Sequence, residues 1–225
     1  MKVGIEPVGR EREPLVVIDD FAVDPDALRA FATGAELGPA AHHYPGLRAP
    51  LPDYYLPTQL REIAAVLADA FGQAGQVGVI DASYSIVTTL PADLSVAQRL
   101  PHCDAHARNR IALIHYLSPD SDGTAFFRHR STGFETVDER RAAIYTDQLA
   151  AELRHGGPPP AAYIASDTAL FERTMLAEAH YNRALLYRSC LLHSGAIAPD
   201  AALSPDAAVG RLTITGFLSI GGVAI

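Results

Sequence analysis

The sequence predicts a mainly β protein with flanking helices, whose short strands would form an antiparallel sandwich or a jelly roll. Apolar runs rich in β-branched and aromatic residues, separated by turn signals, recur from residue 81 to residue 220. Helical patterns do not alternate with these runs, as they would in a protein with a parallel sheet. Hydrophobic residues make up 48% of the 225 residues, which is enough for the core of one domain.

The predicted elements divide this single domain into two parts. Strands are expected at residues 15–18, 81–90, 111–117, 124–129, 171–179, 184–192 and 212–220. Helices are expected at residues 24–32, 58–71 and 137–154. Residues 1–75 should therefore form helical support and a loop. Residues 76–225 should hold the β core, with a helical insert near residues 137–155.

Local signals set the ends of several elements and the connections between them. Asp24 before Pro25 is typical of a helix N-cap followed by proline, whose missing N–H costs nothing in the first turn. Residues 38–57 contain many prolines and glycines and are expected to be a loop. Residues 180–183 are expected to be a hairpin turn, and the Pro/Asp/Ala-rich residues 199–210 a longer hairpin loop.

Charge and composition exclude several classes of partner. The formal net charge of −8 argues against nucleic acid or an anionic membrane surface as the main partner. The two cysteines do not form a disulfide framework. The N-terminal residues lack the apolar core of a signal peptide, and no apolar run approaches the roughly 20 residues that span a bilayer. A soluble cytoplasmic protein is therefore expected, either a monomer or a homodimer.

A His-x-Asp motif is the strongest indication of chemistry. His102 and Asp104 are two residues apart, so on a strand both side chains point to one face and can bind the same ion. His193 lies on a later strand run and completes a set of two histidines and one carboxylate. This set is the facial triad that holds non-haem Fe(II) and leaves coordination positions open. The alternative is two core histidines and a turn aspartate.

Three segments together resemble the 2-oxoglutarate/Fe(II)-dependent oxygenases, specifically their prolyl-4-hydroxylase-like branch. These segments read RLPHCDAHARNRIALIHYLSPDSDGTAFFRH, YNRALLYRSCLLHSG and GRLTITGFLSI, and the opening LVVIDDFAVDPDALRAF is also similar to that branch. The resemblance implies a double-stranded β-helix (jelly-roll) core with an N-terminal helical layer.

The resemblance also assigns roles to individual residues. It implies that His102, Asp104 and His193 are the metal ligands and that they are catalytic. Arg211 matches the residue that holds the C5 carboxylate of 2-oxoglutarate, and Tyr116 matches a tyrosine that hydrogen-bonds the same group. Arg211 follows His193 by 18 positions, a longer gap than is usual in the family.

The implied activity is that of a dioxygenase, an oxidoreductase that uses Fe(II), 2-oxoglutarate and O₂. It would couple decarboxylation of 2-oxoglutarate to hydroxylation of a small molecule or a peptide side chain. The alternative is a cupin-like or catalytically silent metal-binding jelly roll with a binding or regulatory role. Arg211 and Tyr116 discriminate between the two, because a protein that binds no 2-oxoglutarate needs no carboxylate clamp.

The loop of residues 38–57 contains a dense group of rings with one cation. Its members are His42, His43, Tyr44, Arg48 and Tyr55. Because binding residues collect on loops, we expect these side chains to border the mouth of the metal cavity and to contact substrate. The alternative is a solvated loop that packs on the barrel.

Overall fold

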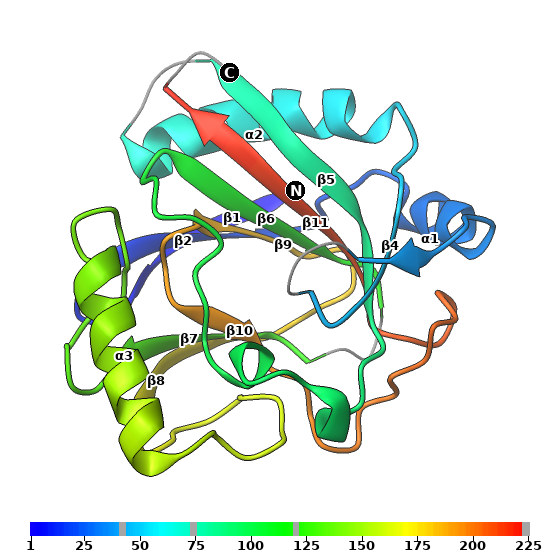
Figure 1. The fold of residues 1–225 in the computed structure, drawn as a ribbon. Coiled ribbons are helices and arrows are strands. Elements are labelled where there is room, and N and C mark those ends of the chain that lie inside the picture. Colours follow the sequence, from blue (N-terminus) through cyan, green and yellow to red (C-terminus); the bar gives the residue numbers. More distant parts are fainter. Residues whose placement is uncertain (41–43, 73–75, 119–121, 222–225) are drawn as a thin grey trace.

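Two antiparallel sheets dominate the computed structural model, which describes residues 1–40, 44–72, 76–118 and 122–221 (Figure 1). The strands are β1 (Lys2–Val8), β2 (Glu13–Asp19), β3 (Gly38–Pro39), β4 (Gly46–Ala49), β5 (Val77–Val87), β6 (Arg110–Tyr116), β7 (Thr124–His129), β8 (Phe171–Ala177), β9 (Ala184–Arg188), β10 (His193–Gly195) and β11 (Leu212–Ile220). The helices are α1 (Pro25–Thr33), α2 (Tyr55–Phe71) and α3 (Ala142–Gly156). The predicted class, mainly β with few helices, is confirmed.

The strands alternate between the two sheets along the second half of the chain. The large sheet has the order β1-β2-β9-β6-β11-β5-β4-β3, and the small sheet has the order β10-β7-β8. From β6 onward the chain enters the small sheet, returns for β9, leaves for β10 and returns for β11. This two-sheet, antiparallel arrangement is jelly-roll-like.

Side-chain alternation explains how β11 serves two faces. Leu212, Ile214 and Leu218 belong to the core beneath the helices. Thr213 and Thr215, at the alternate positions, line a cavity on the other side of the sheet. The strand lies between β5 and β6 and is hydrogen-bonded to both. A shift of its register by one residue would place the polar side chains in the core and the apolar side chains in the cavity.

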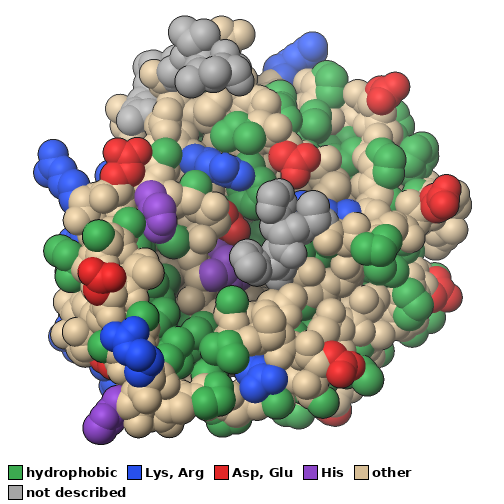
Figure 2. Space-filling model, viewed as in Figure 1, with side chains coloured by type: hydrophobic (Ala, Val, Ile, Leu, Met, Phe, Trp, Pro, Cys, Tyr) green, Lys and Arg blue, Asp and Glu red, His purple; other side chains and the backbone are tan. Residues whose placement is uncertain are grey.

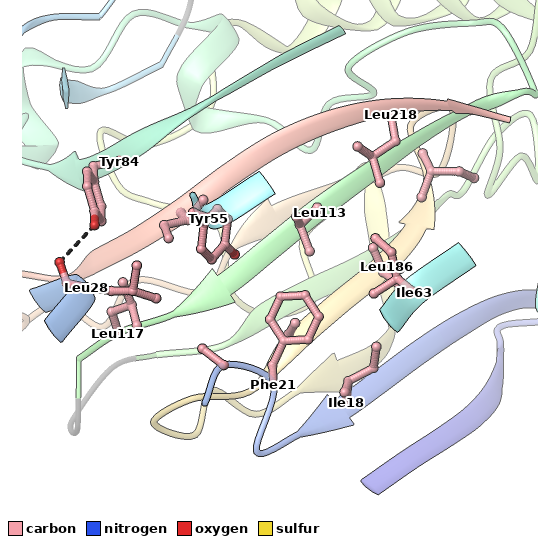
Figure 3. Packing of buried hydrophobic residues seen from close by; sticks show 14 of the residues in the cluster. Ile18, Phe21, Leu28, Tyr55, Ile63, Tyr84, Leu113, Leu117, Leu186 and Leu218 are labelled. Atoms are coloured by element: carbon pink, nitrogen blue, oxygen red, sulfur yellow. Dashed lines mark hydrogen bonds between the residues drawn. The ribbon is translucent and has the colours of Figure 1, made fainter. Parts of the chain in front are cut away.

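Three apolar clusters lie between the helices and the sheets and between the two sheets themselves. The first lies between the large sheet and helices α1 and α2, and Figure 3 shows its side chains. In that cluster the Tyr84 hydroxyl donates a hydrogen bond to the Leu28 carbonyl over 2.8 Å. The second cluster, which includes Phe126 and Leu185, lies between the sheets. The third packs α3 against the small sheet through Tyr145 and Phe127.

The helices begin and end where local chemistry predicts. The Asp24 side chain accepts a hydrogen bond from the Ala27 N–H over 2.9 Å, and Pro25 opens α1. Helix α2 ends at Gly72, whose φ of 66° is a left-handed conformation that glycine adopts without steric cost. Within the described ranges, none of the helices combines the length and apolarity needed to cross a bilayer.

The expectation that residues 1–75 contribute only support and loop needs correction. This part of the chain also supplies β1, β2, β3 and β4 to the large sheet, two strands at each edge. Strand β1 is exposed at six of its seven residues, so it shows no buried apolar face. Strands β3 and β4 are two and four residues long and lie in the predicted loop.

Two predicted hairpins are wrong. Residues 180–183 connect β8 to β9, which lie in different sheets, and residues 199–210 likewise connect β10 to β11. The predicted strand 184–192 is also divided. Its last part leaves the large sheet after Ser189: the Leu192 N–H donates to the Glu135 carbonyl, and His193 pairs with β7 in the small sheet.

Candidate metal centre

Backbone hydrogen bonds bring the three predicted metal ligands together. His102 and His193 form an isolated antiparallel bridge in which each N–H donates to the other carbonyl over 2.9 Å. The Asp104 N–H donates to the Ser189 carbonyl over 2.8 Å. The His-x-Asp segment is therefore held beside the segment that enters β10, although it is 89 residues away from His193 along the chain.

The side chains converge on one point. Oδ1 of Asp104 is 3.6 Å from Nε2 of His102, and Oδ2 is 3.5 Å from Nε2 of His193. One ligand atom from each residue can be chosen so that all three lie within 4.8 Å of one another. Two imidazole nitrogens and one carboxylate oxygen are the donor set that suits Fe(II) with open coordination positions.

The hydrogen bond of His193 to the Leu191 carbonyl fixes its tautomer. Its Nδ1 lies 2.9 Å from the Leu191 carbonyl, which can only accept, so Nδ1 carries the proton. Nε2 is left with a lone pair directed toward Asp104, as in metal sites whose histidines are oriented by a carbonyl. Burial lowers the pKa of His193 to about 4, which keeps the imidazole neutral near pH 7.

Asp104 is the anionic member of the triad. Burial by itself raises the pKa of this carboxyl group, but His193 and His102 lower it below the ordinary value, and Arg110 acts in the same direction. The side chain is 17% exposed, whereas that of His102 is 54% exposed. The site is thus open on the side of His102 and closed on the side of His193.

A cavity of about 770 Å³ extends from the triad between the two sheets. Its floor is formed by residues of β6 and β11, and β10 contributes His193. Figure 2 shows the hollow on the viewed face, with a histidine and an acidic side chain inside it and basic and acidic side chains around its rim. Its volume is within the range of small-molecule sites.

Arg211 lines the same cavity. Its guanidinium donates to the Asp122 carbonyl over 3.1 Å and to the Gly123 carbonyl over 3.2 Å, and it lies 5.7 Å from the centre of the Tyr116 ring. Among the described residues, Arg211 forms no ion pair with a carboxylate. The carbonyls orient the guanidinium but leave its positive charge without a counter-ion.

Tyr116 is fully buried behind this arginine. Its hydroxyl is 2.7 Å from Oγ1 of Thr124, and Thr124 rather than Tyr116 reaches the cavity wall. Tyr187 was not among the predicted site residues, yet its ring lies 4.9 Å from the His193 ring and lines the cavity. The signal for it was present in the sequence, because Tyr187 and His193 share strand parity.

The predicted substrate residues divide into three groups. Tyr44 and Arg48 line the cavity, and the Arg48 guanidinium lies 5.0 Å from the Tyr44 ring. Tyr55 does not border the cavity: it is buried beneath the large sheet at the start of α2, where its hydroxyl is 3.1 Å from Nδ1 of His115. His42 and His43 lie outside the described residues.

Similarity to solved structures shows the fold. The chain is similar to HygX from Streptomyces hygroscopicus, whose structure contains nickel, 2-oxoglutarate and hygromycin B. The TM-score is 0.51 and the identity 11%, over 95% of this chain and 84% of HygX. It is also similar to SnoK, a non-haem α-ketoglutarate-dependent carbocyclase from nogalamycin biosynthesis. Here the TM-score is 0.50 and the identity 12%, over 94% and 83% of the two chains. The two-sheet architecture is thus one that such enzymes share.

Sequence comparison gives a family without an assigned activity. No curated protein matches the chain. The model of DUF6445, described as a family of unknown function, matches residues 1–218. Because this match extends over nearly the whole sequence, the chain belongs to the DUF6445 family.

Proposed function

We propose that this protein is a non-haem Fe(II)- and 2-oxoglutarate-dependent oxygenase that hydroxylates a small molecule or a peptide side chain. The observation that carries the proposal is one cavity with two complementary features. His102, Asp104 and His193 converge on one of its walls, and Arg211 lines it without a carboxylate partner among the described residues.

The triad fits Fe(II) by its donor chemistry. His193 is neutral and presents Nε2, Asp104 is ionised, and His102 is open to the cavity. Three protein ligands leave positions for a bidentate 2-oxo acid and for O₂. When bound, Fe(II) and 2-oxoglutarate supply the oxidising chemistry, with decarboxylation of the 2-oxo acid coupled to insertion of oxygen into a C–H bond.

Arg211 would bind the distal carboxylate of 2-oxoglutarate. Removing a carboxylate from water without a partner is costly, and a planar guanidinium compensates with two parallel hydrogen bonds. The carbonyls of Asp122 and Gly123 already fix the plane of the Arg211 side chain, so little side-chain entropy is lost on binding. Tyr116 would support Arg211 from behind, and Thr124 would offer a hydroxyl at the cavity wall.

The fold similarity supports the same proposal. HygX binds nickel and 2-oxoglutarate, and it shares the two-sheet architecture with this chain. We infer that β5, β11, β6 and β9 face β10, β7 and β8 as the two halves of a double-stranded β-helix. The N-terminal helices α1 and α2 would then support the outer face of the large sheet.

Anaerobic titration tests the proposal directly. Protein loaded with Fe(II) is titrated with 2-oxoglutarate, and the metal-to-ligand charge-transfer absorption is followed. A saturable band is expected for the wild type and none for Asp104→Ala, because that variant lacks the anionic metal ligand. Metal binding without any 2-oxoglutarate band would instead support a cupin-like or silent metal protein. Absence of metal binding would overturn the metal assignment as well.

A further inference from the structure

A second arginine, Arg110, lines the cavity and has no carboxylate partner among the described residues. Arg110 begins β6 and points to the cavity side of the large sheet, as do Ala112 and Ile114 at alternate positions. Its guanidinium carbon lies 4.4 Å from the centre of the Phe217 ring. The Nε atom is buried and has no hydrogen-bond partner among the described residues.

Two other arginines with largely buried side chains are paired with carboxylates. Arg183 forms hydrogen bonds to both carboxylate oxygens of Asp19, and Arg188 donates to Glu13 over 3.0 Å. In the described part of the chain, Arg110 takes no part in an ion pair. A buried donor without an acceptor is unfavourable, so an acceptor supplied by a bound molecule would satisfy it.

Arg110 also lies close to the metal ligands. Ser189 donates its N–H to the Arg110 carbonyl over 2.9 Å, and its own carbonyl accepts from Asp104 over 2.8 Å. A single residue therefore links the backbones of Arg110 and Asp104. The electrostatic effect of Arg110 on the Asp104 carboxylate is consistent with this proximity.

Arg110 and Arg211 lie near opposite ends of β11. Arg110 is paired with Ser219 across β6 and β11, whereas Arg211 directly precedes β11. The eight residue steps from 211 to 219 correspond to roughly 26 Å of strand, at about 3.3 Å per residue. The two arginines therefore attach at opposite ends of β11, and we assign Arg110 to a molecule other than the five-carbon diacid held by Arg211.

We propose that Arg110 binds a carboxylate group of the prime substrate and so selects monoanionic organic acids. This inference rests on the proposed oxygenase function, since it assigns the second molecule in the same cavity. A single guanidinium fork matches the two oxygens of one carboxylate. Arg48, the other cation near this end, is 3.6 Å from Asp81 and is already partly neutralised.

The surroundings define the rest of the ligand. Phe217 and Ile80 line the cavity near this end and offer apolar surface beside the anion-binding group. Thr215 lines the same wall and can donate or accept one hydrogen bond. The substrate class that fits is therefore a carboxylic acid with an apolar portion close to the carboxylate.

Matched pairs of acids and amides test the inference. The protein is loaded with Zn(II), which the same ligands accept and which does not turn over, and is saturated with 2-oxoglutarate to fill the Arg211 site. Aliphatic and aromatic monocarboxylic acids, each paired with its primary amide, are then titrated by saturation-transfer NMR. We expect the acids to bind at least about tenfold more tightly than their amides, because a charged hydrogen bond is lost in the amide.

Variants attribute this preference to one side chain. In Arg110→Gln the acid and the amide should bind equally, and Arg110→Lys should restore part of the preference because lysine keeps the charge but not the fork. Arg61→Gln, an exposed position on α2, is the matched control and should keep the wild-type preference. Loss of the preference in the control as well would overturn the inference.

Three other outcomes would also overturn it. They are equal binding of acids and amides to the wild type, an acid preference that survives in Arg110→Gln, and no binding of any pair. If Arg110→Gln binds Zn(II) more weakly but keeps the preference for acids, Arg110 stabilises the Asp104 carboxylate instead of binding the substrate. If 2-oxoglutarate itself fails to bind while the acid preference still depends on Arg110, the oxygenase proposal fails and the anion site stands.

Discussion

At the scale of residues, the triad depends on backbone contacts more than on packing of its side chains. The bridge between His102 and His193 and the Asp104–Ser189 hydrogen bond position the three Cα atoms. The side-chain tips then meet because these backbone contacts fix the position from which each ring or carboxylate extends. Truncation of one of these side chains should therefore remove the metal site without disturbing the surrounding backbone.

The first prediction concerns His193. In His193→Ala the metal loses a neutral, pre-oriented ligand. Removing a residue that only hydrogen-bonds a metal ligand weakens metal binding about 10–100-fold, so loss of the ligand itself should cost at least as much. We expect the affinity for Fe(II) or Mn(II) to fall at least about 100-fold, as measured by calorimetry and metal analysis. His155→Ala, at the exposed end of α3, is the control and should bind metal like the wild type. Equal metal content in the two variants would refute the assignment of His193.

The second prediction concerns Arg211. Arg211→Ala should weaken 2-oxoglutarate binding at least about tenfold, because charged hydrogen bonds contribute about 1.5–3 kcal/mol each. Arg211→Lys should recover only part of this loss. Metal affinity should stay near the wild-type value in both variants. The charge-transfer titration described above measures the effect, and an alanine variant that titrates like the wild type would make Arg211 a structural residue.

The sequence could predict which residues line the cavity where these residues alternate along one segment and so point to the same side. Parity places His102 with Asp104, and Arg211 with Thr213 and Thr215, and these residues do line one cavity. Parity does not show which distant strands are neighbours, so the contact between Asp104 and Ser189 could not be predicted. Tyr55 was assigned to a loop, but it begins α2 and its ring packs into the core.

At the scale of elements, a buried histidine connects α2 to the large sheet. His115 on β6 is fully buried, with Nδ1 facing the Tyr55 hydroxyl and Nε2 3.0 Å from Oδ1 of Asn182. Oδ1 can only accept, so Nε2 carries the proton and Nδ1 accepts from Tyr55. Asn182, at a φ of 62°, also exchanges hydrogen bonds with the backbone of Ala22.

This arrangement predicts a loss of stability in mild acid. Burial lowers the pKa of His115 to about 4, whereas an unfolded histidine titrates near 6.5. Between these values the unfolded chain binds more protons than the folded one, so the free energy of unfolding falls as the pH falls from about 6.5 to about 4. Between pH 7 and pH 5 the contribution of His115 is about 2 kcal/mol.

Urea denaturation at pH 7 and pH 5 measures this effect. His115→Gln removes the titrating group, so its free energy of unfolding should depend less on pH than that of the wild type, by about 2 kcal/mol over this interval. The comparison between the two proteins cancels contributions from other groups that titrate in the same range. An identical pH dependence of wild type and variant would show that His115 is not held neutral in the folded protein.

Elements were predictable to the degree that they are buried. Strands β2, β6, β7 and β11 carry continuous or alternating apolar residues, and each was predicted close to its observed range. Strand β1 could not be predicted, because an exposed edge strand shows no apolar period. The hairpin errors arise from a different cause: a turn sequence shows where the chain reverses but not which sheet it enters next.

At the scale of the whole molecule, the cavity lies between the two sheets. Phe126 and Leu185 fill the space between the sheets on one side, and the triad and Arg211 occupy the open part. Helices cover the outer faces of both sheets, so the apolar side chains there need no further partner. Metal and 2-oxoglutarate would therefore connect residues of the large sheet with residues of the small sheet.

This connection predicts that the ligands stabilise the whole fold. At a concentration about 100 times the dissociation constant, a ligand that binds only the folded state adds about 2.7 kcal/mol to the free energy of unfolding. For a chain of this length, each kcal/mol raises the melting temperature by about 2–4 °C. We therefore expect Mn(II) with 2-oxoglutarate to raise the Tm by about 5–10 °C in thermal denaturation followed by circular dichroism.

Asp104→Ala, which lacks the anionic ligand, should show almost no rise, whereas Arg61→Gln should respond like the wild type. An equal rise in Asp104→Ala would mean that the ions bind elsewhere, because this variant lacks the carboxylate of the triad.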